Sequence, residues 1–179
     1  MTKLTDDAIL QTAAELVRKT GNLKVTLQDV GAALGVSHAA LYKHFASKQA
    51  LWTALALRWL DQALAALFPY RATAAADTAT IAHDWLWTLA DAKRQARLRD
   101  PAMFAVYTAY IAADTAAYTQ HTQALGQSFM AATGKDAAFT TGVLFSFMFF
   151  SAPEYAARWD ADFQQNFELT WAVVRPAFV

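Results

Sequence analysis

The chain of 179 residues has no cysteine, which excludes disulfides, thiolate nucleophiles and thiolate metal sites. Glycine and proline are scarce, at six and four residues, and they lie where helices would end. No segment alternates apolar and polar residues for long enough to suggest a strand, while alanine and other helix formers dominate. The sequence therefore predicts an all-α fold.

Several functional classes lack their signatures in this sequence. There is no glycine-rich phosphate loop, no pair of carboxylates on one helical face and no serine in a nucleophile elbow, so we expect neither an enzyme nor a bound cofactor. His83 and His121 have no acids at ligand spacing, and we predict no metal site.

Membrane and secretory signals are also weak. The N-terminal residues MTKLTDDAIL lack the apolar core of a signal peptide, and we expect a cytoplasmic protein. Residues 137–153 carry no charge and approach the lower limit of about 17 residues for a membrane span. Their threonines and serines, the closing Pro153 and the lack of a basic flank argue against insertion.

The net charge is zero, whereas nucleic-acid-binding proteins are usually basic. The charges are unevenly distributed, however. Residues 1–50 hold six lysines and arginines against four acids, a net +2, and residues 70–179 hold eight against ten, a net −2. The asymmetry favours an N-terminal end that faces DNA.

Capping residues and glycines divide the chain into segments of helical periodicity. Thr5, followed by two aspartates, begins the first helix, and Gly21 ends it. The fourth helix has an apolar surface too wide for burial on one side, so we expect it to contact both parts of the chain, and residues 71–77 are predicted to be a linker. The nine predicted helices cover residues 5–20, 26–35, 37–45, 47–69, 77–98, 101–113, 115–133, 136–151 and 154–175.

The second and third helices are short and are joined by the tight turn Gly35-Val36-Ser37, which is the outline of a helix-turn-helix. In the third helix, Leu41 and Phe45 share a face and point toward a core. The opposite arc then faces outward and carries His38, Ala39, Tyr42 and Lys43. Such a face suits a helix that lies in the major groove of DNA.

Residues 5–51 resemble the DNA-binding domain of the TetR family of bacterial repressors. The resemblance rests on the GVS turn and on the run that follows it, with Leu41, Tyr42, His44, Phe45, Ser47, Lys48 and Leu51 at fixed spacing. It implies that phosphates are contacted by Thr26, Gln28, Tyr42, His44 and Lys48. It also implies that Ser37 caps the recognition helix and contacts the DNA backbone, and that bases lie near His38, Ala39 and Lys43.

Alternatives to these roles stay open at this point. Tyr42 also suits a half-buried packing role, and His44 also suits the end of a helix or the edge of a core. Each lysine taken singly is most simply a solvated side chain. Gly31 and Gln49 depart from the alanine and the acid that are usual in the family, and neither change removes a DNA contact.

The resemblance implies that the rest of the chain forms a dimerisation and ligand-binding domain. The run GVLFSFMFF (142–150) predicts a helix buried on all sides, with a second subunit covering one of them. Aromatic residues recur every four positions in the last helix, and the two helices suit an intermolecular four-helix bundle, although an intramolecular core stripe is the alternative. The predicted dimer residues are Phe147, Phe150, Trp159, Phe163, Phe167 and Trp171.

An aromatic-lined cavity would suit a hydrophobic ligand, with plain core packing as the alternative for each residue. The candidate lining residues are Trp85, Leu89, Phe104, Tyr107, Tyr110, Ile111, Phe129 and Phe145.

The sequence thus predicts a helix-turn-helix domain over residues 1–50 and a helical bundle over residues 51–179 that dimerises and binds a small molecule. The expected function is a dimeric regulator that binds double-stranded DNA at a near-palindromic operator and represses until a hydrophobic ligand releases it. The alternative is a helical protein-interaction adaptor, or an activator without repressor activity.

Overall fold

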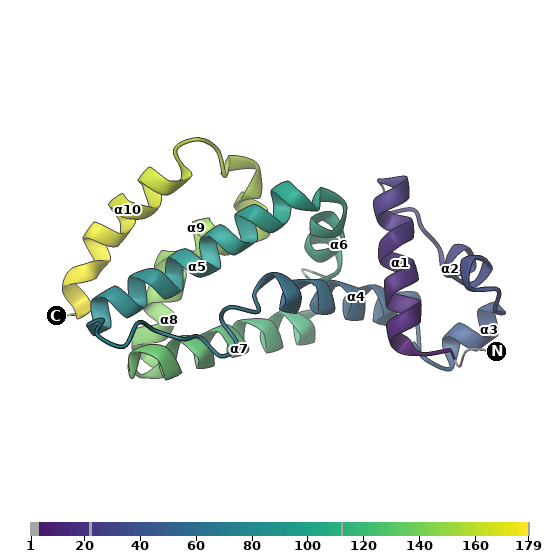
Figure 1. Ribbon diagram of the computed structural model, residues 1–179, viewed down its shortest axis with the longest axis horizontal. Coiled ribbons are helices and arrows are strands. Elements are labelled where there is room, and N and C mark those ends of the chain that lie inside the picture. The colour runs from purple at the N-terminus through teal and green to yellow at the C-terminus, as the bar shows by residue number, and fades with distance from the viewer. Residues whose placement is uncertain (1–3, 22, 112, 179) are drawn as a thin grey trace. The chain divides into compact units, whose positions relative to one another are not determined.

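A computed structural model describes residues 4–21, 23–111 and 113–178, and it confirms the all-α fold (Figure 1). The described residues form no β-strand; Leu67 and Tyr70 make an isolated β-bridge. The α-helices are α1 (Asp6–Thr20), α2 (Leu27–Leu34), α3 (His38–Tyr42), α4 (Lys48–Ala63), α5 (Thr78–Arg99), α6 (Pro101–Ile111), α7 (Thr115–Thr133), α8 (Ala137–Ser146), α9 (Met148–Ser151) and α10 (Phe163–Val174). Two 3₁₀ helices, η1 (Pro153–Arg158) and η2 (Arg175–Phe178), complete the described chain, and no described helix is long and apolar enough to cross a membrane.

The chain divides into two compact units. Unit 1 comprises Met1–Gln62 and Arg99–Tyr118, and unit 2 comprises Ala63–Leu98 and Thr119–Val179. Unit 1 therefore includes α6 as well as the N-terminal helices, because α1 packs against α6 as well as α2. The division into residues 1–50 and 51–179 was drawn by function rather than by packing, and it stays a prediction.

Local signals set the ends of α1 as predicted. The Thr5 hydroxyl accepts a hydrogen bond from the amide of Ala8 at 3.2 Å, and Gly21 ends the helix in the left-handed region at φ +65°. One face of the helix, including Ile9, Ala13 and Val17, is buried. These caps satisfy amides and carbonyls that a helix end would otherwise leave unpaired.

Polar and aromatic contacts tie α6 to the rest of unit 1. The Arg18 guanidinium donates to the Asp100 carboxylate, with Nη2 and Nε 2.8 and 2.9 Å from Oδ2. On α4, the Trp52 ring stacks on Tyr110 at a centroid distance of 5.9 Å. Unit 1 is thus a helix-turn-helix supported by a helix from later in the chain.

The fourth helix is shorter than its sequence pattern predicts. It ends at Ala63, and turns follow up to a cis peptide bond between Phe68 and Pro69. Leu64 and Leu67 stay buried although they have left the helix. The Leu67 carbonyl is instead satisfied by the Ser128 hydroxyl at 2.6 Å. Burial of apolar residues therefore continues past the helix end, which is why the pattern overestimated its length.

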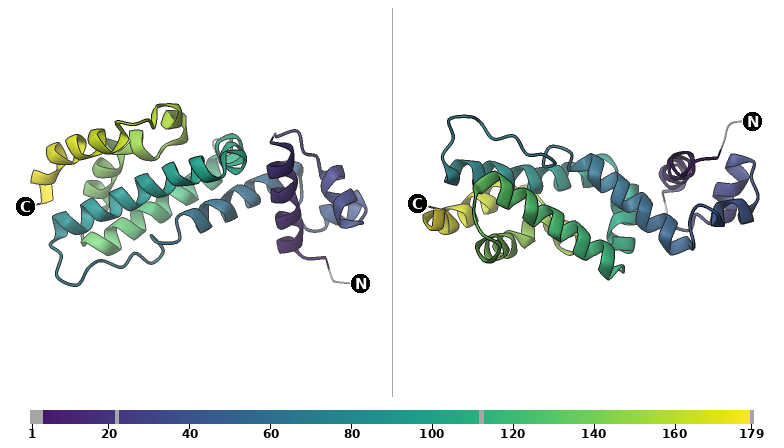
Figure 2. Two further views of the ribbon diagram at one scale, coloured as in Figure 1. Left: turned by 45° about the horizontal axis from the view of Figure 1, so that its top comes forward. Right: turned by 90° about the horizontal axis from the view of Figure 1, so that it is seen from below.

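Unit 2 is built around α5, which lies between α7 and α10 (Figure 2). Toward α7, the Trp85 ring meets Phe129 edge-on at 5.1 Å, and its indole N–H donates to the Ser128 hydroxyl at 3.0 Å. Toward α10, Trp87 meets Phe167 at 4.9 Å. Aromatic side chains thus fill both sides of α5, and Trp85, Phe129 and Phe167 are fully buried.

The last two predicted helices are each interrupted, which corrects the sequence-based boundaries. The segment predicted at 136–151 breaks between α8 and α9 at Phe147, whose φ and ψ of −101° and 9° leave the helical region. The segment predicted at 154–175 begins as the 3₁₀ helix η1 and becomes α-helical only at Phe163. Trp159 lies between the two, and its indole N–H donates to the Phe149 carbonyl at 2.8 Å.

One pair of basic side chains lies inside unit 2. Lys93 on α5 and His121 on α7 are 4% and 9% exposed, and Lys93 Nζ lies 3.4 Å from His121 Nε2. Burial lowers the pKa of Lys93 to about 7, a shift that the charge of Glu154 partly offsets. Burial, and then the Lys93 charge, lowers the pKa of His121 to about 3. Both shifts show that a charge in this interior is costly.

Replacing Lys93 by methionine should therefore stabilise the protein at neutral pH. Because the folded-state pKa of Lys93 is lowered from 10.5 to about 7, the unfolded chain binds more protons between these values. The cost of the buried charge is complete below about pH 7 and disappears as the pH rises toward 10.5. We expect Lys93→Met to raise the free energy of unfolding by about 1–4 kcal/mol at pH 7, and we expect the gain to shrink at alkaline pH, as measured by chemical denaturation.

The exposed Lys19 provides the control, because Lys19→Met removes the same charge from the surface and should change stability little at either pH. A Lys93→Met protein less stable than the wild type at pH 7 would contradict the assignment of a net cost to the buried charge.

Candidate nucleic-acid interface

The helix-turn-helix begins with a capping box on α2. The Thr26 hydroxyl accepts from the Asp29 amide at 3.2 Å, and the Asp29 carboxylate accepts from the Thr26 amide at 2.8 Å and from its hydroxyl at 2.7 Å. These hydrogen bonds, the side-chain one most, lower the pKa of the Asp29 carboxyl. The box fixes the entrance of α2 and holds Thr26 at the protein surface.

The turn between α2 and α3 is tight. Gly35 takes the left-handed conformation at φ +65°, and the Val36 amide donates back to the Gly31 carbonyl at 3.0 Å. A Cβ atom at position 31 would lie 3.1 Å from the Val36 carbonyl oxygen, closer than side chains normally approach. The glycine at 31, which departs from the usual alanine, therefore allows this close approach.

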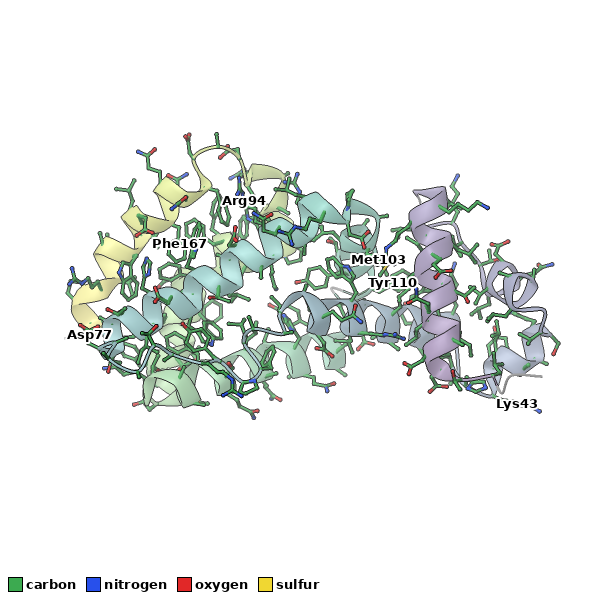
Figure 3. The ribbon with its side chains drawn as sticks, in the orientation of Figure 1. Lys43, Asp77, Arg94, Met103, Tyr110 and Phe167 are labelled. Atoms are coloured by element: carbon green, nitrogen blue, oxygen red, sulfur yellow. The ribbon has the colours of Figure 1, made fainter. Side chains whose placement is uncertain are left out.

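The recognition helix α3 has the predicted orientation. Ser37 caps it, with its hydroxyl accepting from the Ala40 amide at 3.2 Å. Leu41 and Phe45 are buried at 1% and 9% exposure, although Phe45 lies after the end of the helix. The outward residues His38, Ala39, Tyr42 and Lys43 are all exposed, and Figure 3 shows Lys43 projecting from the outer end of α3.

The His38 and Tyr42 rings meet edge to face on this surface, with centroids 4.8 Å apart. They stand one turn apart on the helix, so each ring limits the rotamers of the other. Tyr42 is 45% exposed, so part of its ring is open to a partner while part packs on His38, and its DNA contact stays a prediction.

An open groove of about 580 Å³ lies between α2 and α3. Its walls are formed by Thr26, Leu27, Gln28, Gly31, Ala32, Val36, His38, Tyr42 and Lys48. Five of these nine residues were predicted to contact DNA. The groove thus brings five of the nine predicted residues together; the other four, Ser37, Ala39, Lys43 and His44, do not line it.

His44, another predicted DNA contact, is bound to a carboxylate within the protein. Its Nδ1 atom lies 2.6 Å from a carboxylate oxygen of Asp6, at the start of α1, and its side chain is 25% exposed. Lys48, four residues later, begins α4 and is exposed, while the Ser47 hydroxyl accepts from the Ala50 amide at 3.0 Å. The His44 ring is thus bonded to Asp6 through Nδ1 and is still partly exposed to solvent.

The candidate ligand-pocket residues are divided between the two units. Four of them belong to unit 2 and four to unit 1, where α6 carries them. Phe145 is 66% exposed and faces solvent instead of an interior cavity. The remaining residues pack in the cores of their units, with Tyr110 against Trp52 in unit 1 and Trp85 against Phe129 in unit 2.

The six predicted dimer residues lie in the core of unit 2, where side chains of the same chain cover them. Each is 8% exposed or less, and the set is Phe147, Phe150, Trp159, Phe163, Phe167 and Trp171. In Figure 3, Phe167 points from α10 toward α5. The structure therefore has the intramolecular aromatic stripe, and a second subunit has no access to these rings.

A different apolar set on the same helices is exposed. On α8, Phe145 is 66% exposed. On α10, Leu169 is 61% exposed and Val173 is 81% exposed. The exposure of Leu169 and Val173 was not predicted from the sequence, although they are four residues apart, because the aromatic stripe on the other side of α10 is the stronger signal.

Histidines elsewhere have partners that the sequence did not predict. His83 Nδ1 lies 2.9 Å from the Asp84 carboxylate, and its Nε2 lies 3.2 Å from the Glu168 carboxylate. Within the described ranges, no group of three or more histidine, aspartate or glutamate side chains could hold a metal ion.

Residues 9–55 match the family model of bacterial regulatory proteins of the tetR family. Over these residues the chain is similar to the N-terminal domain of the TetR family. The match covers α2, the turn, α3 and most of α1 and of the first half of α4, so it includes all nine predicted DNA-contacting residues. The sequence matches no curated protein.

Solved structures of similar fold cover more of the chain than this family model does. It is similar to BioQ in a crystal structure with its natural double-stranded DNA operator, with a TM-score of 0.60, 21% identity and coverage of 97% of this chain and 99% of BioQ. It is also similar to SCO0253, a TetR-family transcriptional regulator from Streptomyces coelicolor, with a TM-score of 0.59, 19% identity and coverage of 98% and 95%. A putative transcriptional regulator from Streptomyces coelicolor A3(2) has a TM-score of 0.56 at 22% identity, with coverage of 98% and 96%.

Removing the Thr26 hydroxyl should weaken the helix-turn-helix of this protein. Thr26→Val keeps the side-chain shape but loses the acceptor of the Asp29 amide, which typically costs about 1 kcal/mol for a helix N-cap. Thr26→Ser keeps the hydroxyl and should stay close to the wild type. Chemical denaturation monitored by circular dichroism measures the difference, and equal stability of the two variants would show that the capping box contributes nothing.

Proposed function

We propose that this protein is a DNA-binding transcriptional regulator that represses from a near-palindromic operator as a homodimer. The observation that carries the proposal is the outward face of α3, because a capped recognition helix exposes His38, Ala39, Tyr42 and Lys43 while Leu41 holds it from behind. A protein-interaction adaptor, the alternative, would show no selective DNA binding.

Two kinds of DNA contact follow from the positions of the side chains. Ala39 allows close approach to a base pair, and Lys43 at the outer end of α3 reaches a guanine edge or a phosphate. Residues at the helix ends around the groove are suited to the DNA backbone, because side-chain donors and unpaired amides meet phosphates there. The proposed phosphate contacts are Thr26, Gln28, Ser37, Tyr42, His44 and Lys48.

Replacing Tyr42 and Lys43 by alanine should abolish selective DNA binding without unfolding the protein. Both side chains are exposed, so their loss removes little packing. A single base contact is worth about 1–3 kcal/mol, so we expect affinity to fall at least about fivefold for each residue that makes one. A gel shift with duplexes from the DNA flanking the protein's own gene measures this loss.

Lys19→Ala removes an exposed charge from the last turn of α1 and is the matched control, with binding close to the wild type. The absence of any salt-sensitive retardation by the wild-type protein would overturn the proposed function. Equal binding by the double variant and the wild type would overturn the role of α3.

A dimer would place two α3 helices on one duplex, with half-sites about 34–36 Å apart in successive major grooves. We propose that the exposed apolar residues Phe145, Leu169 and Val173 form the dimer surface. Burial of such residues removes apolar area from water, and clusters of large exposed apolar side chains are typical of association surfaces.

Charges on this surface should prevent self-association. Leu169→Glu with Val173→Glu places two carboxylates on the exposed face of α10, and we expect sedimentation to show monomers with an unchanged fold. Gln164→Glu, on an exposed position on a different side of α10, should leave the dimer intact. A dimer that survives the double substitution would place the interface elsewhere.

Release by a small hydrophobic ligand belongs to the same proposal. A ligand changes DNA affinity only to the extent that it binds one arrangement of the two recognition helices better than another. The aromatic interior of unit 2, with Trp85, Trp87 and Phe129 around α5, supports a hydrophobic ligand over a polar one.

A further inference from the structure

His44 forms a hydrogen bond with Asp6 at the edge of the proposed DNA-binding surface. The two residues lie 38 positions apart, and the bond joins the turn after α3 to the first turn of α1. At 2.6 Å between Nδ1 and the carboxylate oxygen, it is as short as charge-assisted hydrogen bonds become. The bond therefore fixes the ring at the edge of the proposed DNA-binding surface.

This bond determines where the ring carries its hydrogens. An ionised carboxylate only accepts hydrogen bonds, so Nδ1 must be the donor. A neutral imidazole carries one hydrogen, and with that hydrogen on Nδ1, the Nε2 atom has only a lone pair. A phosphate oxygen also only accepts, so it gains no hydrogen bond from such a ring. An imidazolium carries hydrogens on both nitrogens and donates to both anions.

We propose that Asp6 is a positioning residue that makes the phosphate contact of His44 depend on a proton. This inference rests on the proposed function, in which His44 contacts a DNA phosphate. DNA binding then takes up one proton at Nε2, and by linkage the affinity for DNA falls as the pH rises through the range in which histidines change charge. The limit for one proton is a loss of about tenfold per pH unit.

Other charged and titratable groups near His44 lie on α1, α3 and α4. On α1, Asp7 follows Asp6, but its carboxylate accepts from Arg58 of α4 at 3.0 Å. Lys43 directly precedes His44, and Lys48 begins α4; both are exposed. His38 on α3 is a second histidine on the same surface, and its ring packs against Tyr42.

The test is the dissociation constant for a random-sequence duplex at low, constant ionic strength, from about pH 5.5 to about pH 8.5. The wild type should lose affinity with rising pH. Asp6→Asn should flatten the profile and bind at least as well as the wild type at the alkaline end, because an amide accepts or donates and thus permits the neutral tautomer with hydrogen on Nε2. His44→Gln should also flatten it.

Two controls separate this contact from general charge effects. Asp7→Asn makes the same charge change one residue away and should retain the wild-type slope. His38→Gln, whatever its effect on affinity, should retain it as well. A nitrogen-15 NMR spectrum of the wild-type complex provides a readout independent of any variant, since both His44 nitrogens should carry hydrogens when DNA is bound.

The outcomes distinguish the two claims. A wild-type protein that binds no duplex at any pH defeats the proposed function, and this inference with it. Lys43-dependent DNA binding with the wild-type slope in both Asp6→Asn and His44→Gln overturns the inference alone, as does a bare Nε2 in the complex.

Discussion

A recognition helix of five residues has too few internal hydrogen bonds to persist alone, so its position depends on what holds it from behind. In this protein the burial of Leu41 and Phe45 supplies that support, and Ser37 and Gly35 set the ends of the turn. Because those two apolar side chains are in the core of unit 1, the helical period places the opposite arc of α3 at the solvent-exposed surface. The exposure of His38, Tyr42 and Lys43 follows from this anchoring.

The N-terminal part of the fold was predictable because its signals are local. Thr5, Thr26 and Ser37 each satisfy an amide three residues ahead, and Gly21 and Gly35 each end a helix in a conformation that glycine adopts most readily. Such signals act over one turn of chain and need no knowledge of distant contacts. The outward face of α3 could be predicted for the same reason, from the spacing of Leu41 and Phe45.

The C-terminal part was less predictable because burial there depends on distant partners. A spacing of four residues places Trp159 on the stripe of α10 only if the helix extends that far, and the chain instead turns before Phe163. Nothing in a uniformly apolar run such as residues 142–150 indicates which side chain faces outward, so Phe145 was assigned to an interior. The Asp6–His44 bond was invisible for a similar reason, since its partners are far apart in sequence.

Unit 1 is discontinuous, because α6 returns from beyond α5 to support α1 and α4. A fragment that stops at Gln62 would leave Arg18 without the Asp100 carboxylate and one face of Trp52 without Tyr110. The N-terminal helices therefore depend on α6 for part of their packing. A chimaera that exchanges operator preference with another regulator must either transplant residues 99–118 together with the N-terminal helices or confine the graft to α2, the turn and α3.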